Sequence, residues 1–294
     1  MRKETLYHLK VPVSIALITD THNYPADEIL ISLDNHKPDI IFIAGDFIYA
    51  KLPEKGLKME ESSHAVSLLR GCSSLAPTFV SIGNHEWMLN EDDIDIIRST
   101  GVTFLDNEYV NCIVKKEGTG THKVIHTAKT NCTEQKLIRS DQETSANLII
   151  GGLSSASYMA YKIYCQSLDK KSTGNKDNLY PPIYRKSSVI IDKKPDVTWL
   201  DRFCAEPAYK ILLCHHPEYY PSYLRERDID LILSGHAHGG QIRIFGQGLF
   251  APGQGLLPKL TSGVIDHRLV ISRGLANNTI VPRLFNPEEI VYID

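Results

Sequence analysis

The sequence lacks the features of a secreted, membrane-spanning or disulfide-stabilised protein. Its six cysteines are scattered, and no two of them form a CxxC pair. Several lie in apolar runs such as YVNCIV (109–114), so we expect reduced, mostly buried thiols. The first apolar run is short and interrupted by Pro12, and no stretch of about 20 apolar residues follows. These absences predict a cytoplasmic protein without a signal peptide or a transmembrane segment.

Positive charge is also scarce. The chain has 32 Lys and Arg residues against 35 Asp and Glu residues, a net charge of -3, and no long basic block. A protein that grips a nucleic acid backbone needs a basic surface, so nucleic acid is an unlikely partner. A small phosphorylated substrate remains compatible with this charge. Nothing in the sequence indicates a protein partner.

The composition is that of a globular protein with a large core. Of the 294 residues, 42% are hydrophobic and 23% are charged. No internal repeat and no linker divides the chain, so we predict a single domain over 1–294. Two polar segments, 115–146 and 154–194, interrupt the pattern of apolar runs and are predicted to be loop insertions.

Short runs of Val, Ile and Leu recur along the chain. They do not alternate with polar residues, which is typical of strands covered on both faces. The predicted strands are 13–19, 39–45, 78–83, 147–152, 210–215 and 230–235. Helices are predicted over 25–36 and 90–101, the second with Asn90 as its N-cap and Gly101 as its stop. After about residue 240 the pattern changes to short strands with Gly and Pro turns, at 241–245, 268–274 and 288–294.

Polar side chains follow five of the predicted strands at the point where each strand ends. They are Asp20 and His22, Asp46, Asn84 with His85 and Glu86, His215 with His216, and His236 with His238. In an open α/β sheet, sites form at the carboxyl ends of the strands. We therefore expect these groups to meet at one edge.

The donor types indicate a metal centre. Carboxylate, imidazole and amide form a mixed set that suits Zn²⁺, Mn²⁺, Fe or Co²⁺, whereas Ca²⁺ prefers oxygen alone. No cysteine stands in the motifs, which disfavours a structural zinc site. Seven candidate ligands are too many for one tetrahedral ion and suit two divalent ions that share a carboxylate. The candidates are Asp20, His22, Asp46, Asn84, His215, His236 and His238.

The ordered set DTH…GDF…GNHE…HHP…GHAH, from Asp20 to His238, resembles the calcineurin-like metallophosphoesterase superfamily. The resemblance implies an α/β fold, a four-layer αββα sandwich of two mixed β-sheets flanked by helices. The tail, 235–259 and 270–293, further resembles a branch that includes bacterial lipid-linked UDP-sugar and phosphodiester hydrolases. The segment GGLSSASY (151–158) departs from that branch, where an acidic pair is common.

The resemblance also implies a role for each motif residue. Asp20, His22 and His238 would hold one ion; Asn84, His215 and His236 would hold the other; and Asp46 would bridge both. His85 would be catalytic and face the substrate instead of binding metal. Glu86 would orient neighbouring ligands.

These roles imply a metal-dependent phosphoesterase. Its substrate would carry a phosphodiester, pyrophosphate or phosphomonoester bond, with a lipid or a nucleotide sugar as the candidate compound. Two ions about 3.5–4 Å apart can hold the phosphoryl oxygens and activate a water. The alternatives are a nuclease and a metal-binding scaffold without catalysis.

Some residues keep two interpretations. His215 is favoured over His216 as a ligand, with His216 on the surface or facing substrate. His122 and His126 are expected to be solvent-exposed. Arg273 and Arg283 either touch substrate phosphate or bind carbonyls and acids near the last strands. Finally, an apolar group in segment 242–260 either packs as core or forms a rim that makes peripheral contact with membrane lipid. This group consists of Leu249, Phe250, Leu256 and Leu257.

Overall fold

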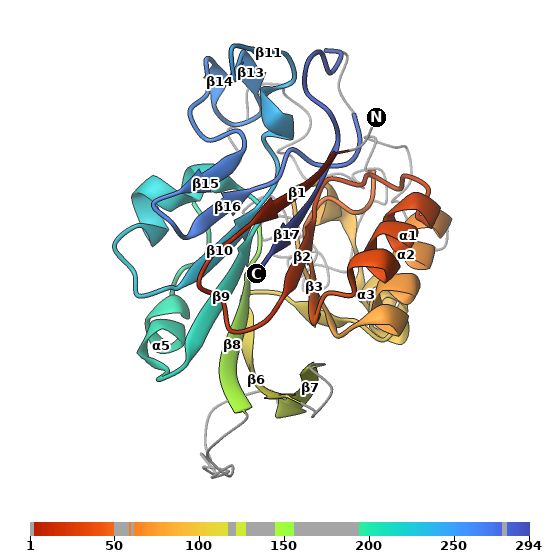
Figure 1. The fold of residues 1–294 in the computed structure, drawn as a ribbon, viewed down its shortest axis with the longest axis vertical. Coiled ribbons are helices and arrows are strands. Elements are labelled where there is room, and N and C mark those ends of the chain that lie inside the picture. The colour runs from red at the N-terminus through yellow and green to blue at the C-terminus, as the bar shows by residue number, and fades with distance from the viewer. Residues whose placement is uncertain are drawn as a thin grey trace, which may run out of the picture.

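Two β-sheets form the centre of the protein in the computed structural model (Figure 1). The structure describes residues 3–49, 59, 62–116, 122–127, 145–155, 194–277 and 281–294. The first sheet has six strands in the order β1-β17-β2-β3-β4-β5. Their bounds are β1 Lys3–Tyr7, β2 Ile15–Ile18, β3 Ile40–Ala44, β4 Thr78–Ser81, β5 Thr103–Leu105 and β17 Glu289–Ile293. Strands β2 to β5 are parallel, and β17 is antiparallel to β2.

The second sheet has seven strands in the order β15-β16-β10-β9-β8-β6-β7. Their bounds are β6 Glu108–Lys116, β7 His122–Thr127, β8 Ser145–Leu153, β9 Tyr209–Cys214, β10 Leu231–Ser234, β15 Gly263–Ile265 and β16 Leu269–Ile271. Strands β8, β9, β10 and β16 run parallel, while β6, β7 and β15 pair antiparallel to their neighbours. Both sheets are therefore mixed.

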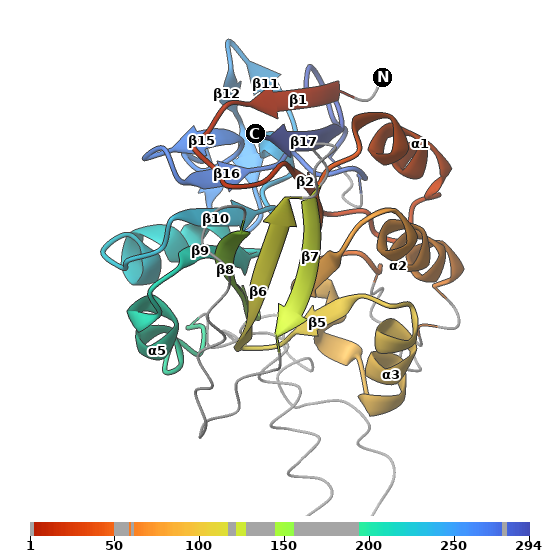
Figure 2. The same cartoon turned by 60° about the horizontal axis from the view of Figure 1, so that its bottom comes forward.

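Helices cover the outer faces of the two sheets. Figure 2 shows α1 (Asp27–His36), α2 (Ser63–Leu75) and α3 (Glu91–Ser99) along one side, and α5 (Leu200–Ala205) on the other. One apolar cluster fills the space between the sheets, including Phe42 from the first and Leu213 from the second. Two further clusters lie between each sheet and its helices. This arrangement confirms the predicted two mixed sheets flanked by helices.

Local sequence signals explain the ends of several elements. Every residue of β3 is buried, as its unbroken apolar sequence predicts. Asn90 caps α3 as predicted: its side chain accepts a hydrogen bond from the Asp93 backbone N–H, and the Asp93 carboxylate accepts one from the Asn90 backbone N–H. Gly101 follows α3 with a φ of 90°, a left-handed conformation that favours glycine.

Some elements were not predicted. Helix α2 buries Ala65, Leu68, Leu69 and Cys72, which have helical spacing. Within the predicted loop insertion 115–146, the described residues form the ends of β6 and β8 and the whole of β7, which contains His122 and His126. The predicted insertion 154–194 lies outside the described residues except for its first two residues and its last.

The C-terminal part builds a small lobe beyond the second sheet. It consists of two hairpins, β11 (Arg243–Ile244) with β12 (Gln247–Gly248) and β13 (Phe250–Ala251) with β14 (Gly255–Leu256). Both hairpins lie at the top of Figure 1. The described helices include none that is long and apolar enough to cross a membrane.

The described cysteines are reduced, as the sequence predicts. Cys72, Cys112, Cys204 and Cys214 form no disulfide, and all except the half-buried Cys204 are buried. Burial raises the pKa of Cys72 and of Cys112 to about 12, so both thiols are unreactive at neutral pH. Cys132 and Cys165 lie outside the described residues.

Candidate metal centre

The ends of five strands, drawn from both sheets, meet at one site. Asp20 and His22 follow β2, Asp46 follows β3, and Asn84 and His85 follow β4 in the first sheet. His215 follows β9, and His236 and His238 follow β10 in the second sheet. Most of these side chains are buried, whereas Asn84 and His85 are half-buried. Polar side chains buried together at this density need a shared partner, because unpaired burial is costly.

Among the described residues the donor atoms form overlapping groups, two of which contain six predicted ligands, while a third joins His22 and Asp46 with His85. In one, the atoms offered by Asp20, His22 and His238 all lie within 4.8 Å of one another. In the other, those of Asp46, His215 and His236 do so. The His215 Nε2 lies 3.1 Å from Asp46 Oδ2 and 3.9 Å from Asp20 Oδ1, so the groups adjoin. The structure thus brings these six predicted ligands together in the grouping that the sequence implied, and their binding of metal stays a prediction.

Backbone carbonyls orient three of the imidazoles. The Nδ1 of His215 lies 2.7 Å from the Ala44 carbonyl oxygen, and the Nδ1 atoms of His22 and His238 each lie 3.3 Å from a carbonyl oxygen. A ring that donates its Nδ1–H to a carbonyl keeps the Nε2 lone pair for a cation. The Nε2 atoms of His215 and His238 point at the carboxylates of the cluster.

Burial controls the charge of the cluster. It lowers the pKa of His22 to about 3, and it lowers the pKa values of His236 and His238 as well. These rings are therefore neutral at pH 7, as metal ligands must be. Burial also opposes ionisation of Asp46, but the imidazoles of His215 and His85 outweigh it and hold its pKa well below the usual value. The Asp46 carboxylate in turn raises the pKa of His215 to about 10 against the effect of burial, so a cation that binds this ring must displace a proton.

The backbone is strained at most of the predicted ligands. Non-glycine residues rarely have a positive φ, yet φ is 53° at Asp20, 45° at His22, 54° at Asp46, 64° at His236 and 46° at His238. Such conformations cost free energy and persist only where the surrounding structure enforces them. Their concentration here indicates a functional site.

Two loops of the first sheet touch beside the site. A Cβ added to Gly45 would lie 2.6 Å from Gly83 Cα, so a side chain there would push the loops apart. Asn84 follows Gly83, and its buried Oδ1 accepts no hydrogen bond within the described part of the chain. A buried amide oxygen without a donor fits a cation as its partner. The donor set therefore fits the two divalent ions that the sequence implies.

Glu86 organises these loops. Its carboxylate accepts hydrogen bonds from the backbone N–H groups of Gly83 (2.7 Å), Asp46 (2.8 Å) and Ile48 (3.2 Å). Burial and the nearby Asp46 carboxylate raise the pKa of Glu86 to about 8 despite these bonds. The residue fixes the backbone of Asp46, consistent with the orienting role that the sequence implied.

His85 is the half-buried edge of the cluster. Its backbone N–H donates to Asp46 Oδ1 at 2.8 Å, and its Nε2 lies 3.9 Å from Asp46 Oδ2. Its ring lies against those of His22 and Tyr49. Its side chain is 19% exposed, compared with 2% for Asp46. It therefore borders both the buried carboxylate and the open side of the site, as a group that faces substrate must.

Glu218 was not singled out from the sequence. It lies in a 3-10 turn, η4 (Pro217–Tyr219), and its Oε1 is 3.5 Å from His236 Nε2. His216, Glu218 and His236 form a further group whose donor atoms lie within 4.8 Å of one another. His216 is half-buried and its Nδ1 lies 3.0 Å from Ser155 Oγ. The sequence feature that could have identified Glu218 is its position directly after the HHP motif.

The second hairpin of the lobe reaches the site. A Cβ added to Gly253, between β13 and β14, would lie 2.1 Å from Glu218 Oε1 and 3.3 Å from His236 Nε2. Phe250, Leu256 and Leu257 are exposed (37%, 82% and 65%), whereas Leu249 is half-buried. The interpretation as core is therefore wrong for Phe250, Leu256 and Leu257.

The two arginines have different surroundings. Arg283 donates to the carbonyl oxygens of Ala276 (3.0 Å) and Arg273 (2.7 Å), and to others nearby, which confirms its carbonyl-binding interpretation. Arg273 has an ion pair with Glu289, with 3.8 Å between Nε and Oε1.

Three comparisons with known proteins found similarities, and one of them, a family profile, covers the residues of this site. The sequence profile of the family described as "Calcineurin-like phosphoesterase" matches residues 13–240. The "Uncharacterized protein YpbG" of Bacillus subtilis (strain 168) is 49% identical over 47 residues, which are 16% of this chain and 17% of that protein. The solved structure "Termus thermophilus Sulfate thiohydrolase SoxB in complex with glycerol" is similar with a TM-score of 0.40 and 14% identity, over 76% of this chain and 48% of that one. The profile covers most of the chain and contains every predicted ligand, so the protein belongs to the calcineurin-like phosphoesterase family.

Proposed function

We propose that this protein hydrolyses a phosphodiester, pyrophosphate or phosphomonoester bond at a centre of two divalent metal ions. The observation that carries the proposal is the pair of adjoining donor groups, with Asp20, His22 and His238 on one side and Asp46, His215 and His236 on the other. Membership of the calcineurin-like phosphoesterase family supports metal-dependent phosphoester hydrolysis. Zinc, manganese, iron and cobalt all suit the donor set.

The protein's own residues have distinct tasks in this reaction. When bound, the two cations supply Lewis acidity to the phosphoryl oxygens and to an attacking water. Asp46 would bridge the two ions, because it offers a donor atom within 4.8 Å of those of His215 and His236 and also groups with His22. Asn84 supplies a neutral oxygen, which leaves more positive charge for the phosphate than a carboxylate would. His85, at the open edge of the site, would protonate the leaving oxygen.

The dinuclear centre is tested by metal analysis of Asp46→Asn. The wild-type protein reconstituted with Mn²⁺ or Zn²⁺ is expected to hold two ions per chain, and the variant fewer, with turnover abolished because the bridge loses its charge. Asp95→Asn is the matched control, since the Asp95 side chain is 74% exposed on α3. A wild-type content of one ion or none would contradict the proposal.

His85→Ala separates leaving-group protonation from metal binding. We expect a full metal content and a rate loss of about 10²–10⁴-fold towards a substrate with a poor leaving group. A nitrophenyl ester, whose leaving group needs no proton, is expected to lose much less. Equal losses for both substrates would exclude His85 as the general acid.

For the substrate class, we propose a lipid phosphoester, with a nucleotide sugar as the alternative. The exposed Leu256 and Leu257 support this class, because the turn of the same hairpin lies against His236 and Glu218. The test is a hydrolysis screen of phospholipids, nucleotide sugars and simple mono- and diesters. Preferential cleavage of DNA or RNA would favour a nuclease, and no cleavage by the metal-loaded protein would favour a binding scaffold.

A further inference from the structure

The turn between β11 and β12 contains a phenylalanine, Phe245, in a backbone conformation that bulky side chains disfavour. Phe245 and Gly246 connect the two strands, with φ of 50° and 84°. A two-residue hairpin turn with two positive φ values is typical of Asn-Gly, because a bulky side chain is strained in the left-handed region. The Phe245 side chain is also fully exposed, with a relative accessibility of 106%. Neither local conformation nor burial explains a phenylalanine here.

Phe285, on a neighbouring segment, also combines a positive φ with an exposed side chain. Its φ is 54° and its side chain is 86% exposed. The two segments lie side by side, because the Arg243 backbone N–H donates to the Leu284 carbonyl oxygen at 3.0 Å. Ile244 and Leu284 beside them are also exposed, at 46% and 47%. Four large apolar side chains thus face solvent on adjacent turns, an arrangement that marks an interaction surface.

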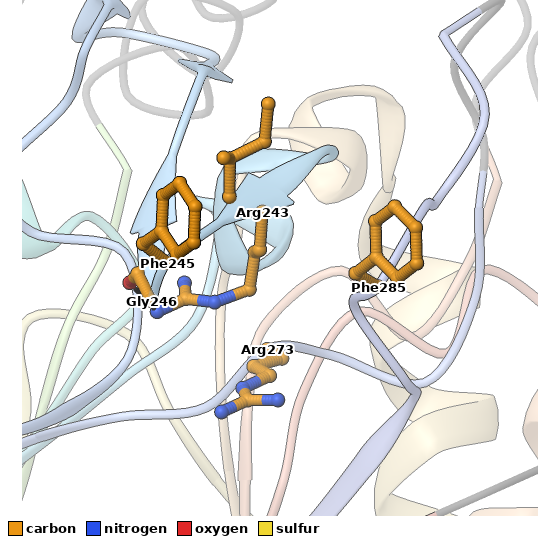
Figure 3. A pocket seen from close by; sticks show the side chains of 6 residues that line it. Arg243, Phe245, Gly246, Arg273 and Phe285 are labelled. Carbon is orange, nitrogen blue, oxygen red and sulfur yellow. Dashed lines mark hydrogen bonds between the residues drawn. The ribbon is translucent and has the colours of Figure 1, made fainter.

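Between the two phenylalanines lies a pocket that contains two guanidinium groups. Figure 3 shows Phe245 and Phe285 on opposite sides, with Arg243 and Arg273 between them. The pocket has a volume of about 480 Å³ and includes none of the predicted metal ligands. A volume of a few hundred Å³ is typical of a site for a small ligand group.

The pocket has an excess of positive charge. The buried carboxylate of Glu289, 3.8 Å from Arg273 Nε, balances one guanidinium, and its oxygens also accept bonds from Thr5 Oγ1 and the Arg273 backbone N–H. Arg243 Nη1 donates to the Gly239 carbonyl oxygen and to Thr261 Oγ1. Within the described residues, the buried Nε of Arg273 has no hydrogen-bond partner, so the ion pair with Glu289 is its polar contact there. Burial and the charge of Arg273 lower the pKa of Arg243, which an anion in the pocket would relieve.

We infer that this face docks on a bilayer that contains anionic phospholipid, with Phe245 and Phe285 inserted beside a headgroup phosphate bound by Arg273. In this arrangement the lipid phosphate would contact the guanidinium nitrogens, and the acyl chains beside it would contact the exposed apolar side chains on either side of the pocket. This docking face is separate from the metal centre and goes beyond the proposed phosphoester hydrolysis. It is a binding property of the chain and can be measured without turnover.

The test is flotation of the purified protein with vesicles of phosphatidylcholine, alone or mixed with phosphatidylglycerol. The wild-type protein is expected to bind the mixed vesicles more tightly and to be released by salt. Phe245→Asn together with Phe285→Asn is expected to lower the partition coefficient about tenfold or more. Phe245→Asn creates the favoured Asn-Gly turn, so its melting temperature should stay unchanged or rise. If the Phe245 ring instead stabilised the fold, Phe245→Asn would lower the melting temperature.

Charge is tested separately with Arg273→Gln. We expect about a fivefold loss of binding to the mixed vesicles and little change with phosphatidylcholine alone. Ile31→Ser (62% exposed on α1) and Arg98→Gln (on α3) are the matched controls and should bind as the wild type does. Failure of the wild type to bind mixed vesicles would overturn the inference. So would full binding by the double phenylalanine variant.

Discussion

At the scale of single residues, the candidate centre is prepared for cations by contacts that lie outside it. Carbonyl oxygens of Ala44, Ile48 and Ala276 each face the Nδ1 of one histidine. Glu86 fixes the Asp46 backbone through its own backbone contacts. Partners of this kind set the tautomer and direction of a ligand, so they affect metal affinity without touching the metal.

Glu218→Gln tests whether the same holds for His236. The carboxylate lies 3.5 Å from His236 Nε2, and the amide that replaces it has the same shape but no charge. We expect the affinity of the more weakly held ion to fall about 10–100-fold. Competition with a chelating dye measures this affinity directly. Glu226→Gln, at an exposed position, is the control; equal affinities in all three proteins would mean that Glu218 does not position His236.

At the scale of elements, the strands deliver the chemistry and the helices support them. Each of β2, β3, β4, β9 and β10 is buried along almost its whole length and is followed by a donor residue. The strained backbone begins where these strands end, at residues such as Asp20, Asp46 and His236. The regular elements provide rigidity, and the short loops after them place the side chains.

Helix α3 offers a test of a supporting element away from the metal centre. Asn90→Ala removes the capping box with Asp93 and is expected to destabilise the protein by about 1 kcal/mol. Asn90→Ser keeps a capping oxygen and should retain most of the stability. Denaturant unfolding measures the difference. Metal content is expected to be unchanged in both variants, and a loss of metal in Asn90→Ala would show that α3 also supports the loop of His85.

At the scale of the whole molecule, the centre joins the two sheets. Asp20, Asp46 and Asn84 come from the first sheet, while His215, His236 and His238 come from the second. Each predicted donor group contains residues of both sheets. Cations bound there would cross-link the two layers of the sandwich in addition to enabling hydrolysis.

Removal of metal is therefore expected to lower the stability of the entire fold. Binding of one ion at a free concentration of 100 times its Kd contributes about 2.7 kcal/mol. Thermal unfolding of the metal-loaded protein, before and after chelation and dialysis, measures the effect. The melting temperature should fall on chelation and recover when Mn²⁺ or Zn²⁺ is returned. An unchanged melting temperature after verified loss of metal would contradict the cross-linking role.

The sequence by itself determined the strands that build the site and the order of its motifs. An unbroken apolar run such as 40–44 indicates burial on both faces, and the donor that follows must lie at the end of that strand. The cap at Asn90 is equally local, since its partner Asp93 is three residues away. These features depend on neighbouring residues alone, so they can be predicted without knowing how distant segments pack.

Only the tertiary structure decided which distant side chains meet. Glu218 comes beside His236 because β9 and β10 are neighbours in the second sheet. Arg243 belongs to β11 and Arg273 follows β16, and only the fold brings both to one pocket. The exposure of Phe245 and Phe285 depends on left-handed turns that a hydrophobicity pattern does not reveal. The physical reason is that periodicity reports which residues are buried locally, whereas contacts between separate turns depend on sheet order and backbone dihedrals.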